Sequence, residues 1–177
     1  MSTPQEPSYL NPRLPESLKQ QFLQKLKTPE EAVQLIRSGD RIYIGSNCGE
    51  PETLAEALCS RKDDLFGCEV THLLTHGIAP YAEPEYAENF RVRNLFIGAN
   101  MRKAVNEGRA DFVPIFLSEI PRLFRNGQLP IDVAMVSVTP PDEHGYCSMG
   151  VAVDIGMAAC EVARVILAEV KPDMPRT

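Results

Sequence analysis

Residues 131–150 read IDVAMVSVTPPDEHGYCSMG, and the first half of this stretch indicates the class of fold. From Ile131 to Val138, every residue is apolar except Asp132 and Ser137. A short, nearly continuous apolar run that contains β-branched residues is typical of a strand inside a parallel sheet, buried on both faces. Pro140 then ends the strand, because proline has no N–H group for the ladder of hydrogen bonds.

The second half of the stretch is a loop that is dense in polar groups. In open parallel sheets, ligands bind where loops leave the carboxyl ends of the strands. We therefore predict that the loop between Thr139 and Gly150 lines a binding site. A rigid surface turn with ordinary polar side chains is an equally weighted alternative. The candidate site residues in this loop are Pro140, Asp142, His144, Gly145, Ser148 and Gly150.

The rest of the chain alternates between strand and helix patterns. Further strands are expected at 41–44, 69–74, 93–97, 111–115 and 164–170. Helices are expected at 15–26, 29–38, 100–106, 117–125 and 154–163, with another around 54–58. The alternation predicts an α/β fold with a mostly parallel sheet and helices on both faces, because right-handed crossovers connect parallel strands.

Two more loops follow predicted strands and contain glycine. The first contains Gly45, Ser46, Asn47, Gly49 and Pro51, and the second contains His76 and Gly77. A glycine turn between a strand and a helix can present backbone N–H groups to an anion. Neither loop has the phosphate-loop pattern that ends in Gly-Lys-Ser/Thr, or the Gly-x-Gly-x-x-Gly dinucleotide pattern. A tight connection between strand and helix is the simpler interpretation.

Composition indicates one soluble domain and excludes several classes of partner. The chain has 177 residues and a net charge of −6 with no basic cluster, so no nucleic-acid partner is expected. Its five cysteines include no Cys-x-x-Cys pair, which favours a reducing, cytoplasmic setting. The polar amino terminus is not a signal peptide, and no apolar run is long enough to cross a membrane. We expect an extended arm at 1–14 and the domain at 15–177.

The reactive side chains do not form a recognised catalytic or metal-binding set. A metal site needs three or four ligands at compatible spacing, which the histidines do not provide, so we predict no metal. A thiol hydrolase that uses Cys147 with His144 is a weaker alternative, because three residues of spacing on a loop do not provide the geometry. His72 lies within a predicted strand and is expected to be a packing residue of the core.

Several stretches together resemble one known family. The loop Thr139–Gly150, TPPDEHGYCSMG, strongly resembles a signature of the acetyl-CoA hydrolase/transferase family, whose members are class I CoA-transferases. Residues 45–51, 96–102, 106–114, 117–124 and 171–176 also agree with the family, in the same order. The resemblance implies the amino-terminal domain only of a two-domain, NagB/RpiA-like α/β architecture, in which two similar halves face each other across an active site.

The resemblance implies an acyl-CoA:carboxylate CoA-transferase of the acetyl-CoA, 4-hydroxybutyrate or butyrate type. Its substrate is a coenzyme A thioester, and no cofactor is bound covalently. In the family, a glutamate of the C-terminal half forms a glutamyl-CoA thioester. Neither Glu50 nor Glu143 matches the motif of that glutamate, so no catalytic residue is expected in this chain. The residues from Gly45 to Pro51, Thr75 to Tyr81 and Thr139 to Gly150 are expected to line the shared cleft.

The same resemblance also implies which partners the chain has. The C-terminal catalytic half lies outside this sequence, so the chain alone is predicted to be inactive. The expected partners are that half, an acyl-CoA and a small carboxylic acid, and an open sheet edge favours a homo-oligomer. Two alternatives stay open: an acetyl-CoA hydrolase of the same family, and a non-catalytic subunit that pairs with a partner carrying the catalytic half.

Overall fold

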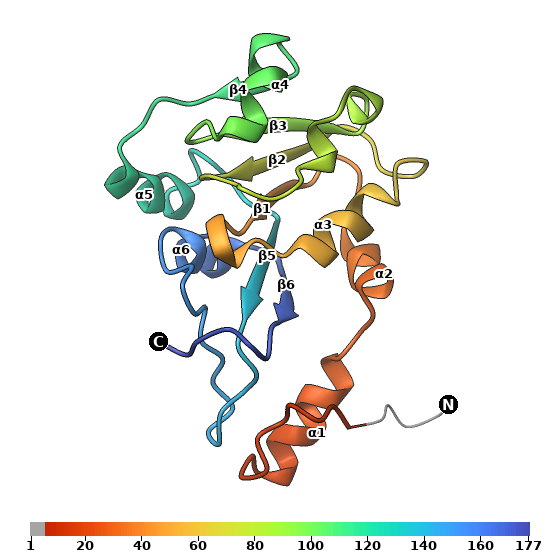
Figure 1. Cartoon of the computed structure of the whole chain (residues 1–177), viewed down its shortest axis with the longest axis vertical. Helices are drawn as coiled ribbons and strands as arrows, with labels where there is room; N and C mark the ends of the chain where they lie inside the picture. The colour runs from red at the N-terminus through yellow and green to blue at the C-terminus, as the bar shows by residue number, and fades with distance from the viewer. Residues whose placement is uncertain (1–5) are drawn as a thin grey trace.

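The computed structural model describes residues 6–177, so the first five residues of the expected arm lie outside the described residues. Residues 6–14 form turns, in which Leu10 and Leu14 are buried. The helix α1 (Glu16–Lys25) follows and lies apart from the sheet, at the lower end of the molecule in Figure 1. The prediction of a helix at 15–26 is confirmed.

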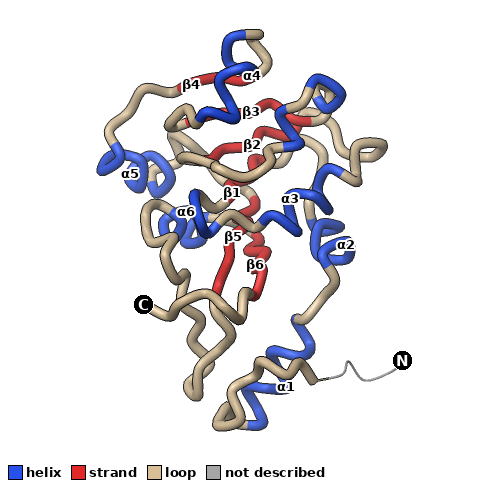
Figure 2. The backbone as a smooth tube through the Cα atoms, in the orientation of Figure 1, coloured by secondary structure: helices blue, strands red, loops and turns tan. Residues whose placement is uncertain are grey.

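The centre of the molecule is a six-stranded sheet in which all neighbouring strands are parallel (Figures 1 and 2). The strands are β1 (Arg41–Ile44), β2 (Cys68–His72), β3 (Phe90–Asn94), β4 (Ala110–Phe112), β5 (Val133–Val138) and β6 (Val165–Val170). Their spatial order is β4-β3-β2-β1-β5-β6. All six residues of β5 are buried, as expected for a central strand. The predicted α/β fold with a parallel sheet is confirmed.

Helices cover both faces of the sheet. The remaining helices are α2 (Pro29–Ala32), α3 (Glu52–Cys59), α4 (Arg102–Asn106), α5 (Ile120–Arg125) and α6 (Gly156–Val162). One apolar cluster contains residues of α3 and α4, such as Leu58 and Ala104, and the other contains residues of α5 and α6, such as Phe124 and Ala159. No helix among residues 6–177 is long and apolar enough to cross a membrane.

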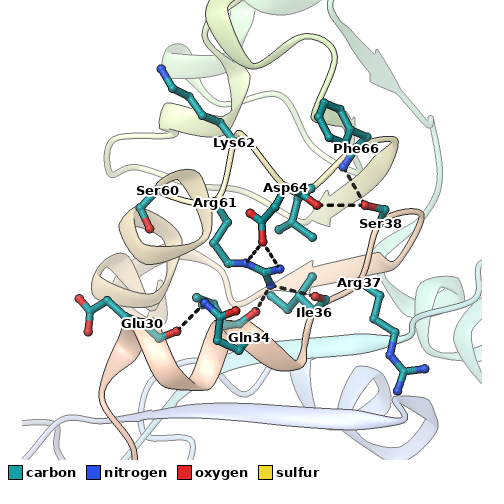
Figure 3. Close-up of polar contacts among 12 residues, drawn as sticks. Glu30, Gln34, Ile36, Arg37, Ser38, Ser60, Arg61, Lys62, Asp64 and Phe66 are labelled. Carbon is teal, nitrogen blue, oxygen red and sulfur yellow. Dashed lines mark hydrogen bonds and ion pairs between the residues drawn. The ribbon is translucent and has the colours of Figure 1, made fainter.

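The second helix is shorter than predicted. Thr28 begins α2 with a capping box, in which its hydroxyl accepts from the Glu31 N–H. The helix then tightens into a 3₁₀ turn at Val33–Leu35, and Ile36 is extended, so the helical turns end before Gly39. Arg61 stabilises this ending from the far end of α3, because its guanidinium donates to the carbonyls of Val33 and Ile36 (Figure 3).

The third strand begins three residues earlier than predicted. The sequence favoured 93–97, but β3 spans Phe90–Asn94, and its buried residues include Phe90 and Val92. Its register with β2 pairs Cys68 with Phe90, so the start of one strand fixes the start of the other. The local apolar pattern did not contain this information, because strand pairing is a contact between distant parts of the chain.

The strand order places a topological switch point beside β1. Along the chain, the sheet first grows from β1 through β2 and β3 to β4, and then β5 pairs with the opposite side of β1. The loops that leave β1 and β5 therefore lead to helices on opposite faces of the sheet. Open α/β sheets bind ligands at such a switch point, outside the carboxyl ends of the strands.

Candidate functional site

Three turns at the carboxyl end of the sheet contain all the predicted site residues. Gly45, Ser46, Asn47, Gly49 and Pro51 follow β1; His76 and Gly77 follow β2; and Pro140, Asp142, His144, Gly145, Ser148 and Gly150 follow β5. The turns after β1 and β2 are in direct contact, because the Asn47 N–H donates to the Leu74 carbonyl at 2.8 Å. The structure therefore brings two of the three predicted groups together along their backbones.

Glycine lets the turn after β1 pack without side chains in the way. A Cβ atom on Gly45 would lie 3.0 Å from the Gly49 carbonyl oxygen. A Cβ atom on Gly49 would lie only 2.3 Å from the Cβ atom of Ala152, in the segment that follows β5. Asn47 has a positive φ of 53°, which asparagine tolerates better than most residues. These turns meet so closely that larger side chains do not fit.

Ser46 and Pro51 are structural residues of this turn. Ser46 is buried, and its hydroxyl accepts from the Leu73 N–H at 3.3 Å, so it links the turn to the end of β2. Pro51 is also buried and stands immediately before α3. In the second turn, His76 is exposed and Gly77 is half-buried.

Glu50 is the one acidic side chain buried in the turn after β1, with 2% of its surface exposed. Its Oε2 atom accepts from the Gly77 N–H at 3.2 Å, and its Oε1 atom has no hydrogen-bond partner among the described residues. Burial raises the pKa of Glu50 to about 7, against the opposing effect of the Gly77 N–H. The sequence drew attention to Glu50 only as a possible nucleophile and did not predict this buried position.

The first turn of α3 does not offer a free anion site. The Leu54 N–H donates to Glu169 Oε2 at 3.2 Å, so a carboxylate from the end of β6 already occupies this helix terminus. Lys171 lies beside it, with its Nζ atom 3.6 Å from Glu169 Oε1 and 2.7 Å from the Glu50 carbonyl oxygen. The predicted anion contact at this turn is thus made within the chain, by residues the sequence did not single out.

The turn after β5 folds back on itself around Asp142. The Asp142 side chain accepts from the N–H groups of His144 and Tyr146, and the backbone of Asp142 donates to the Tyr146 carbonyl. Thr139 and Ser148 close the base, because the Thr139 N–H donates to the Ser148 carbonyl at 2.8 Å. These hydrogen bonds and the positive φ of Gly145 give the loop a hairpin-like shape.

The C-terminal segment lies along this turn and satisfies its polar atoms. Arg176 pairs with Asp142 at 2.6 Å and also donates to the Tyr146 carbonyl. Ser148 Oγ donates to the Thr177 carbonyl at 3.1 Å. A Cβ atom on Gly150 would lie 2.2 Å from the sulfur of Met174, so glycine is required for this contact.

The tip of the turn points away from the other two turns. A Cβ atom on Gly145 would lie 3.1 Å from Leu18, so the tip contacts α1, and Figure 1 shows the turn projecting beyond the sheet toward that helix. His144 is largely exposed. The structure therefore places His144 and Gly145 apart from the predicted residues that follow β1 and β2.

The thiol of Cys147 lacks the surroundings of a nucleophile. Burial raises its pKa, and the positive charge of Arg176 offsets this only in part. A reactive cysteine needs the opposite shift, together with a base within hydrogen-bond reach. No hydrogen bond joins Cys147 to His144 among the described residues. The geometry does not favour a thiol hydrolase.

A groove of about 470 Å³ opens beside the switch point, between the turn after β1 and the C-terminal segment. It is lined by Cys48, Val151, Val170, Lys171, Pro172, Asp173, Met174 and Pro175. Its lining is mostly apolar, with Lys171 as its cation. Within residues 6–177, no cluster of side chains has the composition of a metal site.

His72 is a packing residue, as predicted, but its ring nitrogens have no hydrogen-bond partner among the described residues. Burial lowers its pKa to about 4, so the ring is neutral near pH 7. Its ring centroid lies 6.1 Å from that of Tyr81, whose buried hydroxyl also lacks a partner in the described part of the chain. Burial first, and then the charge of Glu50, raise the pKa of Tyr81.

Comparison with known proteins gives a consistent set of relatives. The family model for the acetyl-CoA hydrolase/transferase N-terminal domain matches residues 12–177. The 4-hydroxybutyrate coenzyme A transferase of Clostridium kluyveri is 42% identical over 156 residues, which are 88% of this chain and 36% of that protein. The succinyl-CoA:acetate/propanoyl-CoA:succinate CoA transferase of Fasciola hepatica is 39% identical over 150 residues, 84% of this chain and 31% of that protein.

Solved structures agree with these relatives. RipA from Yersinia pestis superposes with a TM-score of 0.82 at 31% identity, covering 90% of this chain and 39% of RipA. A 4-hydroxybutyrate CoA-transferase from Porphyromonas gingivalis gives a TM-score of 0.73 at 30% identity, covering 89% of this chain and 36% of that one. The chain spans about a third of the length of the curated relatives it matches.

Proposed function

Because the chain belongs to the acetyl-CoA hydrolase/transferase family, whose N-terminal domain model matches residues 12–177, we propose that it is the amino-terminal domain of an acyl-CoA:carboxylate CoA-transferase. One observation carries this proposal: the curated relatives quoted above are CoA-transferases, and the chain matches only about a third of each. The open groove at the switch point of the sheet supports it, since ligands of α/β sheets bind there.

The proposed substrates are an acyl-CoA thioester and a small carboxylic acid. The two curated relatives named above transfer coenzyme A to or from 4-hydroxybutyrate, and among succinate, acetate and propanoate groups, and we propose the same class of substrate for this chain. Coenzyme A is a substrate here, and no cofactor is held covalently. The mostly apolar lining of the groove suits a short acyl chain.

We propose that the reaction passes through a glutamyl-CoA thioester whose glutamate lies in the C-terminal half. The glutamate oxygen attacks the acyl carbon, and the CoA thiolate leaves, which gives an acyl-glutamyl anhydride. The thiolate then attacks the glutamyl carbonyl carbon, the acyl carboxylate leaves, and the enzyme thioester remains. The acceptor carboxylate repeats these steps in reverse and receives the CoA group.

In this scheme, the chain supplies the shape of one side of the cleft. The glycine turns after β1 and β2 pack tightly, and the N–H groups of Gly45, Asn47, Gly49 and Gly77 already donate within the chain, so these four groups are not free to stabilise an oxyanion. The two glutamates considered at first do not fit the role of nucleophile. Glu50 is buried against Gly77, and Glu143 lies at the far tip of its turn, 3.8 Å from Arg13.

We further propose that the chain works in the cytoplasm and associates with other chains. All five cysteines are free, which suits a reducing compartment. Strand β6 lies at one edge of the sheet and pairs only with β5 among the described residues, so this edge is open to a partner. The expected partner is the C-terminal catalytic half, carried by the same protein or by another subunit, and the assembly is a homo-oligomer.

A thioester exchange assay tests the proposed function. The chain is incubated with acetyl-CoA and 4-hydroxybutyrate, butyrate or succinate, alone and with the C-terminal part of the C. kluyveri relative added separately. We expect exchange only in the mixture. Release of free CoA without formation of a new thioester in the mixture would identify a hydrolase instead, and turnover by the chain alone would overturn the proposal.

A further inference from the structure

The carboxyl group of Glu50 is enclosed between the turns after β1 and β2. Only 2% of the residue is exposed, and the Gly77 N–H donates to its Oε2 atom at 3.2 Å. Its Oε1 atom is fully buried and has no hydrogen-bond partner among the described residues. A buried carboxylate with an unpartnered oxygen is costly when it is charged, because it has lost its water without full replacement.

The turn after β2 packs directly against two acidic side chains. A Cβ atom on Gly77 would lie 3.0 Å from Glu50 Oε2 and 2.7 Å from Glu52 Oε1. The charge of Glu52 further disfavours the ionised form of Glu50, since like charges repel. The carboxyl group of Glu50 is therefore part of the contact between the two turns.

The nearest cation does not neutralise the carboxyl group of Glu50 directly. The Lys171 Nζ atom donates to the backbone carbonyl of Glu50 at 2.7 Å and lies 3.6 Å from Glu169. The other titratable groups that face this region are Tyr81 and His72, which are buried, and His76, which is exposed. The tyrosine and the core histidine are neutral near pH 7, because burial shifts their pKa values away from it.

We propose that Glu50 is a positioning residue that holds the turn after β2 against the turn after β1 while it carries a proton, and releases that turn when it ionises. A neutral carboxyl group still accepts the Gly77 N–H through its carbonyl oxygen and needs no counter-charge. An ionised group gains stability by reaching water, which requires the two turns to separate. Burial raises the pKa of Glu50 to about 7, so the change falls near neutral pH.

The effect of Glu50 on substrate binding rests on the proposed function. If the two turns line the acyl-CoA cleft, then protonation of Glu50 sets whether that side of the cleft is ordered before substrate arrives. The contact between Glu50 and Gly77 is a property of the folded chain, however, and can be measured without any substrate. Its failure and the failure of the transferase proposal are therefore distinguishable.

Amide hydrogen exchange of Gly77, followed by NMR on the chain between pH 5 and pH 8, tests the proposal. After correction for the intrinsic rate, protection of this amide should fall roughly 50-fold over that range and level off above pH 7. Amides of β5, such as that of Met135, should not follow this profile, which separates local opening from global unfolding. Gly77 protection that is constant with pH would overturn the proposal.

Two variants test whether Glu50 causes the pH dependence of Gly77 protection. In Glu50→Gln, the Gly77 profile should lose its pH dependence, because the amide keeps an acceptor but does not titrate. Glu56→Gln, which removes an exposed acid of α3, should keep the wild-type profile. If Glu50→Gln does not fold, the ¹³C chemical shift of the Glu50 carboxyl group is measured against pH in the unmodified chain instead. A titration midpoint near 7 supports the proposal, and a midpoint near 4.5 overturns it.

Discussion

Arg176 Nη2 lies 2.6 Å from Asp142 Oδ2, so a residue near the C-terminal end of the chain pairs with the central acid of the turn after β5. Burial alone would raise the pKa of Asp142, but the N–H groups of Tyr146 and His144 and then the charge of Arg176 outweigh it and hold this pKa below its usual value. The turn and the C-terminal segment are thus one structural unit beside the groove.

Replacing Asp142 by Asn should loosen this unit. Asparagine keeps an acceptor for the two N–H groups but loses the ion pair with Arg176. Because both side chains are partly exposed, amide exchange in residues 171–177 should rise only roughly two- to fivefold. Asp173→Asn, an exposed acid of the same segment, is the matched control and should leave exchange unchanged. Equal exchange in both variants would contradict the structural role of the pair.

Gly49→Ala should destabilise the chain, because the new Cβ atom would lie 2.3 Å from that of Ala152. Overpacking of this kind costs about 1–3 kcal/mol in the free energy of unfolding. The double variant Gly49→Ala/Ala152→Gly removes the clash and should recover at least half of the loss. Urea denaturation of the single and double variants measures both effects. A single variant as stable as the parent would show that the turn after β1 does not touch the segment that contains Ala152.

The stability of the chain should depend on pH through Glu50. The folded chain keeps the Glu50 proton up to about pH 7, whereas the ordinary pKa of 4.5 applies when the chain is unfolded. The stabilisation of the folded chain by protonated Glu50 is therefore complete below pH 4.5 and is lost as the pH rises toward 7. We expect the free energy of unfolding of Glu50→Gln, relative to the parent, to rise by about 1–3 kcal/mol between pH 5 and pH 8.

His72 should act in the opposite direction. Its pKa is about 4 in the folded chain and ordinarily 6.5, so its contribution is complete above pH 6.5 and is lost as the pH falls through 4. Between pH 4.5 and 6.5, Glu50 lowers the free energy of unfolding as the pH rises, whereas His72 raises it. The parent chain shows only the sum of the two effects, so the test compares the parent with a variant that lacks Glu50. Chemical denaturation of Glu50→Gln should show stability that rises with pH in this window. A parallel course for parent and variant would contradict the assigned pKa of Glu50.

Arg61 should be important for stability although it lies far from the groove. Its guanidinium donates to the carbonyls of Val33 and Ile36 and pairs with Asp64, and Figure 3 shows Arg61 in contact with Asp64 and Ile36. Arg61→Ala leaves the two carbonyls without this donor and should lower the free energy of unfolding by about 1–3 kcal/mol. Arg37→Ala, an exposed neighbour, is the control and should have little effect. Equal losses in both variants would argue against this role.

Local patterns predicted most of the fold. The apolar run before Thr139 gave the central strand, and the capping residues around Thr28 gave the start of α2. The shifted position of β3 was missed, because its limits follow from its register with β2 and not from its own composition. The predicted limits of a strand were wrong where pairing with a distant segment decides where that strand begins and ends.

The sequence predicted which loops form the candidate site, but it did not predict the contacts between them. Glycine and proline after each strand marked the turns, and the family resemblance selected among them. The hydrogen bond between Glu50 and Gly77 joins residues 27 apart, and that between Lys171 and Glu50 joins residues 121 apart. Such pairs depend on the order of the strands in the sheet, which the linear pattern does not contain.

The central claim is that the attacking carboxylate of the reaction lies outside this chain. Intact-mass spectrometry of residues 1–177 after incubation with acetyl-CoA tests this claim most directly, because the proposed intermediate is a covalent glutamyl-CoA thioester. We predict an unchanged mass for the chain alone. A mass increase equal to coenzyme A minus one water, lost on treatment with hydroxylamine and mapped to a glutamate such as Glu50 or Glu143, would contradict it.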